Sequence, residues 1–261
     1  MGYTTRMILI ASLLVAATCQ ADEWGDLKGQ FIYGGSPKAP AKLQVTKDVE
    51  VCGKHNLVND ALKVDPKSKG IANVVVYVYL KRSDAKPKVH PSYEKTANAE
   101  VTFDNKNCAF TPRVALLRTT QKLIIGNKDP VGHNTKMTTP SNGEINPIVP
   151  ANDKITKQFK LVERLPCEVQ CSIHPWMKGY LVVKDNPYMA VTDKDGKFEI
   201  KNLPVGEWTF QFWHEKSGYV DEVVLKKGGS QKWKRGRLKV KIDDDGEDLG
   251  MIEVPGKVFD K

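Results

Sequence analysis

Several features that would mark other classes of protein are scarce or missing in this chain of 261 residues. Beyond position 21, no apolar run approaches the roughly 18 residues that a membrane-spanning helix needs. Glycine and proline number 20 and 15, near average usage, which excludes collagen-like and proline-rich low-complexity chains. The six methionines and five histidines form no tract of the kind that stores metal. No Ser/His/Asp or paired-carboxylate constellation that would indicate an enzyme stands out.

The composition is that of a globular protein with a basic surface. Hydrophobic residues make up 40% and charged residues 27%, enough for one large domain or two small ones with a sizeable core. Lysine and arginine total 40 against 31 acids, a formal net charge of +9 that favours acidic partners or anionic surfaces. Residues 225–241 hold eight basic residues and no acid, whereas residues 243–248 hold five acids. Because the basic run contains one aromatic residue, we interpret it as a strand pair with a solvated face and expect no nucleic-acid binding.

The first residues have the pattern of a secretory signal peptide. Arg6 precedes an apolar run of 11 residues, too short to span a bilayer, and small residues follow up to Ala21. We therefore predict cleavage after Ala21 and a soluble protein of the periplasm or the extracellular space. Its net charge would be 39 − 31, or +8, since residues 1–21 contain one arginine and no acid. A lipoprotein anchor at Cys19 is the alternative.

Short apolar runs separated by turn-forming residues recur along the chain, and no long helical period occurs. This pattern predicts an all-β fold of the sandwich or barrel type. The expected strands are residues 27–33, 74–80, 101–103, 122–126, 154–161 and 180–184, with at most a turn or two of helix within 92–99.

The pattern of turns changes after Pro187. A D-x-D-G-x-F turn, a P-x-G turn and a later G-Y pair are formed by Asp193, Asp195, Gly196, Phe198, Pro204, Gly206, Gly218 and Tyr219. This segment resembles the carboxypeptidase regulatory-like module, which is a small transthyretin-like β-sandwich without catalytic residues. We therefore expect two domains after the signal peptide, residues 22–186 and residues 187–261.

The sharpest chemical signal is the segment that runs from Cys171 through His174 to Met177. A thiolate, an imidazole and a thioether fall within seven residues, and a second imidazole, His133, lies 38 residues before the cysteine. Two imidazoles, one thiolate and a weak axial thioether form the ligand set of copper electron-transfer sites, because sulfur stabilises Cu(I) and imidazole accommodates Cu(II). We predict that these four residues hold one copper ion, with Asn134 beside them.

These residues resemble the ligands of the cupredoxins, the type 1 blue copper proteins. Their short ligand loop reads C-x2-H-x2-M with a proline after the histidine, here Pro175, and their first ligand is a histidine followed by asparagine. The resemblance covers residues 122–184 well and the region before them loosely. It implies a Greek-key β-sandwich that carries single electrons between redox partners, and no enzyme, since protein atoms would fill every ligand position. We interpret the remaining candidates as structural: His55, His90, His214 and Met137.

The resemblance also implies a route for the electrons. Cupredoxins expose the edge of the loop histidine within an apolar patch, so we expect electrons to leave through His174 between Pro175 and Trp176. Lys136 and Lys178 flank the ligands and would form a basic rim. The expected partner is a redox protein with an acidic docking face, such as a c-type cytochrome or a periplasmic dehydrogenase.

Cys167 departs from this pattern. Its spacing to Cys171 resembles the dinuclear copper centre of the second subunit of cytochrome oxidase, although Cys171 and His174 are one residue too close for it. On one strand, residues four apart lie about 13 Å from each other, beyond the roughly 7 Å that a disulfide spans. We therefore interpret Cys167 as a buried thiol and keep the dinuclear site as an alternative.

The other two cysteines are the natural disulfide pair. Cys52 and Cys108 remain once Cys171 binds metal and Cys167 is a thiol, and an oxidising compartment permits the bond. A Cys108–Cys167 bond is the alternative. For function, an envelope-binding or structural protein that keeps a cupredoxin scaffold stays open as the alternative to an electron carrier.

Overall fold

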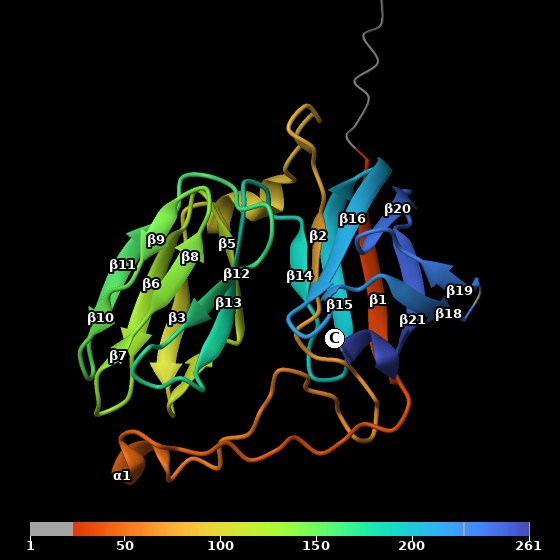
Figure 1. Ribbon diagram of the computed structural model, residues 1–261. Coiled ribbons are helices and arrows are strands. Elements are labelled where there is room, and N and C mark those ends of the chain that lie inside the picture. The colour runs from red at the N-terminus through yellow and green to blue at the C-terminus, as the bar shows by residue number, and fades with distance from the viewer. Residues whose placement is uncertain (1–22, 227, 261) are drawn as a thin grey trace, which may run out of the picture.

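The computed structural model describes residues 23–226 and 228–260, and it is nearly all β, as predicted (Figure 1). The predicted signal peptide, residues 1–21, lies outside the described residues. Within the described residues, no helix has the length and apolar character needed to cross a membrane. The helical elements are short, namely α1 (Val49–Cys52), η1 (Pro91–Thr96) and η2 (Gly256–Phe259). η1 lies where the sequence predicts a short helix.

The first sandwich consists of two main sheets and a short strand pair. One sheet has the order β11 (Lys154–Gln158), β6 (Lys122–Asn127), β3 (Glu100–Lys106), β4 (Ala109–Thr111). The other has the order β5 (Val114–Arg118), β13 (Lys178–Lys184), β12 (Cys167–Gln170), β8 (Lys136–Thr139), β9 (Gly143–Ile145). The short strands β7 (His133–Asn134) and β10 (Ile148–Val149) form the additional pair. Side chains from both main sheets, such as Phe103 and Leu181, enclose one core.

The second sandwich also has two sheets. One has the order β15 (Lys197–Pro204), β1 (Trp24–Gly34), β21 (Glu247–Pro255), β18 (Glu222–Leu225), β19 (Gly229–Lys232). The other has the order β14 (Met189–Val191), β2 (Val75–Val78), β16 (Gly206–His214), β17 (Gly218–Tyr219), and β20 (Arg237–Ile242) also pairs with β16. Alternate residues of these strands, among them Phe31, Phe198, Phe210 and Phe212, form its core.

Two N-terminal strands correct the predicted domain boundary. β1 is antiparallel to β15 and parallel to β21, and β2 lies between β14 and β16. The division into residues 22–186 and 187–261 is therefore wrong for these strands, which belong to the second sandwich. Leu27 and Phe31 of β1 are fully buried in its core. The strand pattern of residues 27–33 predicts a strand but carries no information on which distant strand it pairs with.

The two sandwiches pack directly on each other. Val75 and Tyr77 of β2 meet Tyr180 and Val182 of β13 in a third cluster, which also contains Trp213. The alternate residues of both strands point into their own sandwich cores, so β2 and β13 are buried on both faces. This double burial explains why residues 75–78 and 180–183 are continuous apolar runs and lack the polar alternation of a half-exposed strand.

An arm made of residues 35–70 connects β1 to β2 and reaches the first sandwich (Figure 1). Its outgoing and returning halves meet at the bridge between Lys42 and Val58. Its tip is α1, where Cys52 forms a disulfide with Cys108, with a Cα–Cα distance of 5.5 Å. The predicted disulfide is thereby confirmed over the Cys108–Cys167 alternative. The arm brings a segment that starts in the second sandwich to one end of the first.

The basic run differs from its interpretation as one strand pair. Its residues 229–232 pair with β18 and its residues 237–241, in β20, pair with β16, in two different sheets. Trp233, between them, is buried in the second core. Lys239 and Lys241 form ion pairs with Glu207 and Asp243. The run therefore bridges the two sheets of the sandwich, and the charges at its end are locally compensated.

Candidate metal centre

Three of the four predicted ligands meet at one end of the first sandwich. His133 begins β7, Cys171 follows the last residue of β12, and His174 lies in the loop that leads to β13. The loop is held closed because the N–H of Cys171 donates to the Met177 carbonyl (3.3 Å) and the N–H of Met177 donates to the His174 carbonyl (2.9 Å). A tight connection between two paired strands therefore brings residues 171 and 174 to the place where β7 presents His133.

The donor atoms have the spacing of a metal site. The Cys171 Sγ lies 4.0 Å from Nδ1 of His133 and 3.6 Å from Nδ1 of His174, and the three donors lie within 4.8 Å of one another. Metal–sulfur and metal–nitrogen bonds of ordinary length in a trigonal plane would separate sulfur from nitrogen by about 3.8 Å. All three side chains are buried. Since imidazole and thiolate are also the donor types that copper prefers, these residues fit a copper ion.

Met177 lies close to this group in the same core. It is buried, and its backbone hydrogen bonds tie it to Cys171 and His174. A thioether at this position could supply the weak axial contact of a blue-copper site. Its role as the fourth ligand stays a prediction.

Asn134 connects β7 to the ligand loop. Its Oδ1 accepts hydrogen bonds from the N–H groups of Ser172 (2.7 Å) and Ile173 (3.2 Å) and lies 3.4 Å from the Cys171 sulfur. These bonds hold the loop against the strand that carries His133. The structure therefore places Asn134 beside the candidate ligand Cys171, where the sequence predicted it.

Each of the two imidazoles, His133 and His174, has a carboxylate on its far side, a feature that the sequence reasoning missed. Nε2 of His133 lies 2.9 Å from Asp129 Oδ2, and Nε2 of His174 lies 2.8 Å from Asp48 Oδ2. Such partners orient an imidazole and raise its basicity, and they leave Nδ1 free to bind metal. Asp129 lies four residues before His133, in the short connection between β6 and β7, so a local pattern could have pointed to it. Asp48 comes from the arm, 126 residues from His174, and no local pattern points to it.

The buried groups shift one another's proton affinities. Burial raises the pKa of Cys171, but hydrogen bonds from His133 and from backbone N–H groups outweigh it and lower the net pKa. Burial lowers the pKa of His133, but Asp129 and the Cys171 thiolate outweigh it and raise it to about 9. Burial also lowers the pKa of His174, and this effect is larger than the opposing effect of the hydrogen bond to Asp48. The raised pKa of His133 favours its protonated form in the metal-free site, and metal binding at Nδ1 would displace that proton.

The prediction that the edge of His174 is exposed is wrong for this chain. His174 has 0% of its surface exposed. Asp48 at the tip of the arm contacts its outer nitrogen, and the Trp176 ring lies 5.2 Å from the imidazole and donates a hydrogen bond to the Cys108 carbonyl. The arm buries His174 through a contact between residues 126 positions apart, which the pattern of the loop from Cys171 to Met177 could not predict.

The rim of the site also differs from the expected basic ring. Lys136 pairs with Glu144 at 3.5 Å and Lys178 pairs with Glu168 at 3.4 Å, so both lysine charges have local partners. Pro175 is exposed, and its role in docking stays a prediction.

Cys167 is a buried thiol, as predicted. It lies at the opposite end of β12 from Cys171, and it is not among the side chains of the described residues that are grouped closely enough to hold a metal ion. Its thiol faces the Leu165 carbonyl, and burial raises its pKa to about 12. This position gives no support to a dinuclear site.

Three comparisons relate the chain to known proteins. No family model matches it, and no curated protein does. Among solved structures, a reduced Cu(I) form of an amicyanin variant is 15% identical and covers 42% of this chain and 98% of its own, with a TM-score of 0.30. A purple cupredoxin from Nitrosopumilus maritimus is 22% identical and covers 33% of this chain and 100% of its own, with a TM-score of 0.28.

A copper-containing nitrite reductase from Thermus scotoductus SA-01 is also similar over part of the chain. It is 18% identical and covers 41% of this chain but 25% of its own length, with a TM-score of 0.30. At such identities and TM-scores, these neighbours are proteins that part of this chain is similar to, and they do not assign the chain to a family.

Proposed function

We propose that this protein binds one copper ion through His133, Cys171, His174 and Met177 and carries single electrons between redox partners. The observation that carries the proposal is the spacing of the Cys171 sulfur, 4.0 and 3.6 Å from two imidazole nitrogens in a buried site. Copper would supply the one-electron couple.

The protein contributes a rigid and closed environment. The donors are held by β7, the end of β12 and the short loop before β13, and each imidazole is also fixed by a carboxylate. A ligand set that moves little between two oxidation states keeps the reorganisation small. Because the donors are buried and four protein side chains would fill the coordination positions, a carrier is favoured over an enzyme.

The proposed partner is a redox protein that docks at the ligand end of the first sandwich. We retain Pro175 and Trp176 as docking residues, since the first is exposed and the second packs on His174. Lys136 and Lys178 each pair with a glutamate, so they would attract an acidic partner less strongly than unpaired lysines would. The proposed location outside the cytoplasm is supported by the Cys52–Cys108 disulfide, a bond typical of oxidising compartments.

Two cysteine variants test the proposal. Purified protein loaded with copper should bind one ion per chain and show an intense visible thiolate-to-copper band. Cys171→Ser should abolish this band, whereas the matched variant Cys167→Ser should retain it. Two ions per chain, or loss of the band in Cys167→Ser, would contradict a mononuclear site. A chain that binds no copper would favour the structural alternative.

A further inference from the structure

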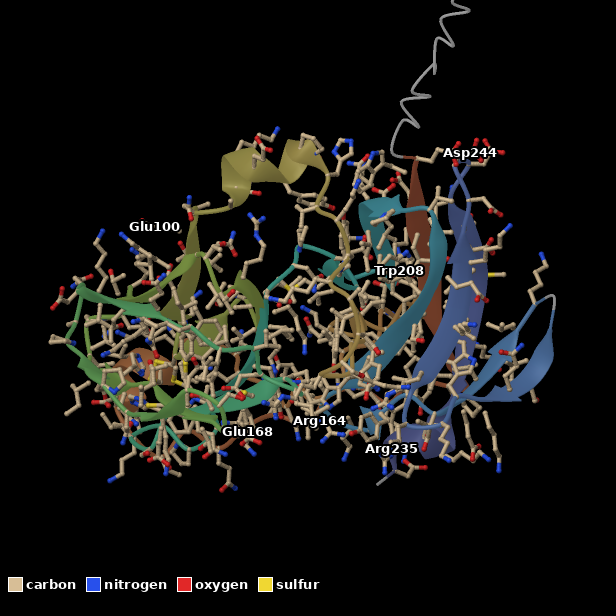
Figure 2. All side chains as sticks on the ribbon, turned by 90° about the horizontal axis from the view of Figure 1, so that it is seen from above. Glu100, Arg164, Glu168, Trp208, Arg235 and Asp244 are labelled. Carbon is tan, nitrogen blue, oxygen red and sulfur yellow. A yellow bond between two sulfur atoms is a disulfide. The ribbon has the colours of Figure 1, made fainter. Side chains whose placement is uncertain are left out.

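A cleft away from the candidate metal centre lies where the two sandwiches meet. It has a volume of about 580 Å³, within the range of small-molecule sites. One wall comes from β2 and the loop after it, with Tyr77 and Leu80, and the other from Val162, Arg164 and the end of β13. Figure 2 shows Arg164 at the junction of the two units. The function proposed above makes no use of this cleft.

The cleft has an excess of positive charge. Its basic and acidic lining residues are Lys81, Arg82, Lys86, Arg164 and Lys184 against Asp84 and Asp185, or 5 − 2 = +3. Lys86 and Asp185 neutralise each other at 2.7 Å, and the Asp84 carboxylate accepts a bond from the N–H of Lys81. Arg82 and Arg164 are exposed, and neither forms an ion pair with any residue that the structure describes.

Lys184 is the unusual group in the wall. It is 6% exposed, and its Nζ donates to the carbonyls of Glu163 (2.7 Å) and Arg164 (3.2 Å) and lies 3.9 Å from the centre of the Tyr77 ring. Within 4 Å it has no carboxylate partner in the described part of the chain. Burial lowers its pKa to about 8.

The carboxylates nearest to Lys184 are already engaged. Asp185 pairs with Lys86, and the Glu163 carboxylate accepts hydrogen bonds from the N–H groups of Ser141 and Asn142. A buried cation without a counterion is costly, and proteins normally pair such charges. Arg113 between the same two sandwiches follows that rule, because Glu215 and Asp60 compensate it. Lys184 differs from Arg113 in that it lines an open cleft.

We propose that this cleft binds a small organic anion with two or more negative charges, whose counter-charges are Arg82, Arg164 and the buried Lys184. Guanidinium groups suit this role because their planar N–H groups bind carboxylate or phosphate in pairs. The partly exposed Leu80 and the exposed Val162 provide an apolar surface for the carbon skeleton of the anion.

Calorimetric titration of the full chain at low ionic strength tests this site, with citrate and inorganic phosphate as separate probes. Binding of citrate, alone or with phosphate, supports an organic polyanion. Binding of phosphate alone would overturn the organic skeleton, and binding of neither would overturn the site. Arg82→Ala and Arg164→Ala should each weaken citrate binding by about tenfold, as expected for loss of a charged hydrogen-bond donor.

Lys160→Ala is the matched control, because it removes an exposed positive charge of the first sandwich that does not line the cleft. It should leave the citrate affinity unchanged. An equal loss in Lys160→Ala would show that citrate responds to net charge and would overturn the site. Repeating the titration with Cys171→Ser should give the same affinity, so this result does not depend on copper binding.

Discussion

The contact between Asp48 and His174 leads to a test of how the arm acts on the candidate metal centre. Asp48 has a left-handed backbone conformation (φ 45°), which asparagine and glycine adopt readily. Asp48→Asn removes the charge but keeps an acceptor for the imidazole N–H, and Asp48→Gly removes the acceptor without backbone strain. The two variants therefore separate the charge of Asp48 from its hydrogen bond.

The expected magnitude follows from the exposure of the contact. A hydrogen bond to a charged group contributes about 1.5–3 kcal/mol when buried, but the Asp48 side chain is 39% exposed, which places the effect at the low end. We expect Asp48→Gly to lower the free energy of unfolding of the metal-free protein by about 1–2 kcal/mol, and Asp48→Asn by less. Urea denaturation measures both values.

The copper-loaded protein provides an independent measurement. A carboxylate behind an imidazole ligand raises its basicity and favours the oxidised ion, so removing the carboxylate should raise the reduction potential. A difference of about 1 kcal/mol between the oxidation states corresponds to about 40 mV for one electron. Glu50→Ala, an exposed acid at the same arm tip, is the matched control. If both Asp48 variants matched Glu50→Ala in stability and potential, the role assigned to Asp48 would be refuted.

Three further predictions concern stability. The double variant Cys52→Ala, Cys108→Ala should lose about 4 kcal/mol of unfolding free energy, because the disulfide closes a loop with a sequence separation of 56. An unchanged urea midpoint when reductant is added to the wild-type protein would contradict this prediction. Burial lowers the pKa of His214 from 6.5 to about 4, so the unfolded chain takes up the proton at a higher pH than the folded chain does. The stability present above pH 6.5 should therefore fall by about 3 kcal/mol as the pH drops to 4. His214→Gln should flatten the profile of stability against pH between pH 6.5 and 5, and an identical profile in this variant would rule the effect out. Arg113→Leu should lower the free energy of unfolding by about 3–5 kcal/mol, because it leaves Glu215 buried without a partner. Adding Glu215→Leu should restore much of that loss. Thermal unfolding of the single and double variants measures both effects, and equal losses in the two would argue against the pairing.

Local sequence patterns predicted much of the first sandwich. They also predicted the three side chains that the structure brings together, His133, Cys171 and His174. The expected strands at 101–103, 122–126, 154–161 and 180–184 correspond to β3, β6, β11 and β13. The ligand loop could also be predicted, because Cys171 and His174 are three residues apart in a connection between paired strands. Over such short separations, covalent geometry and hairpin pairing leave few arrangements, so the spacing of residue types is sufficient.

Strand pairing at long range could not be predicted in the same way. The apolar alternation of β1 predicts a strand whether it pairs with a neighbour in sequence or with β15 and β21, as it does here. Several short strands, such as β7 and β10, are too brief to produce a pattern of their own.

What the sequence by itself determined is the all-β class and the chemistry of the donor set, because residue type and short spacing carry that information. The sequence left two possible partners for Cys108, and the fold decided between them by placing Cys52 of the arm beside it. The tertiary structure decided that His174 is buried, that Asp48 reaches it from the arm, and that a cationic cleft forms between the sandwiches. Each of these depends on residues far apart in the chain, such as Asp48 and His174 at a separation of 126. Their meeting is set by the packing of whole sheets, which no local run of residues encodes.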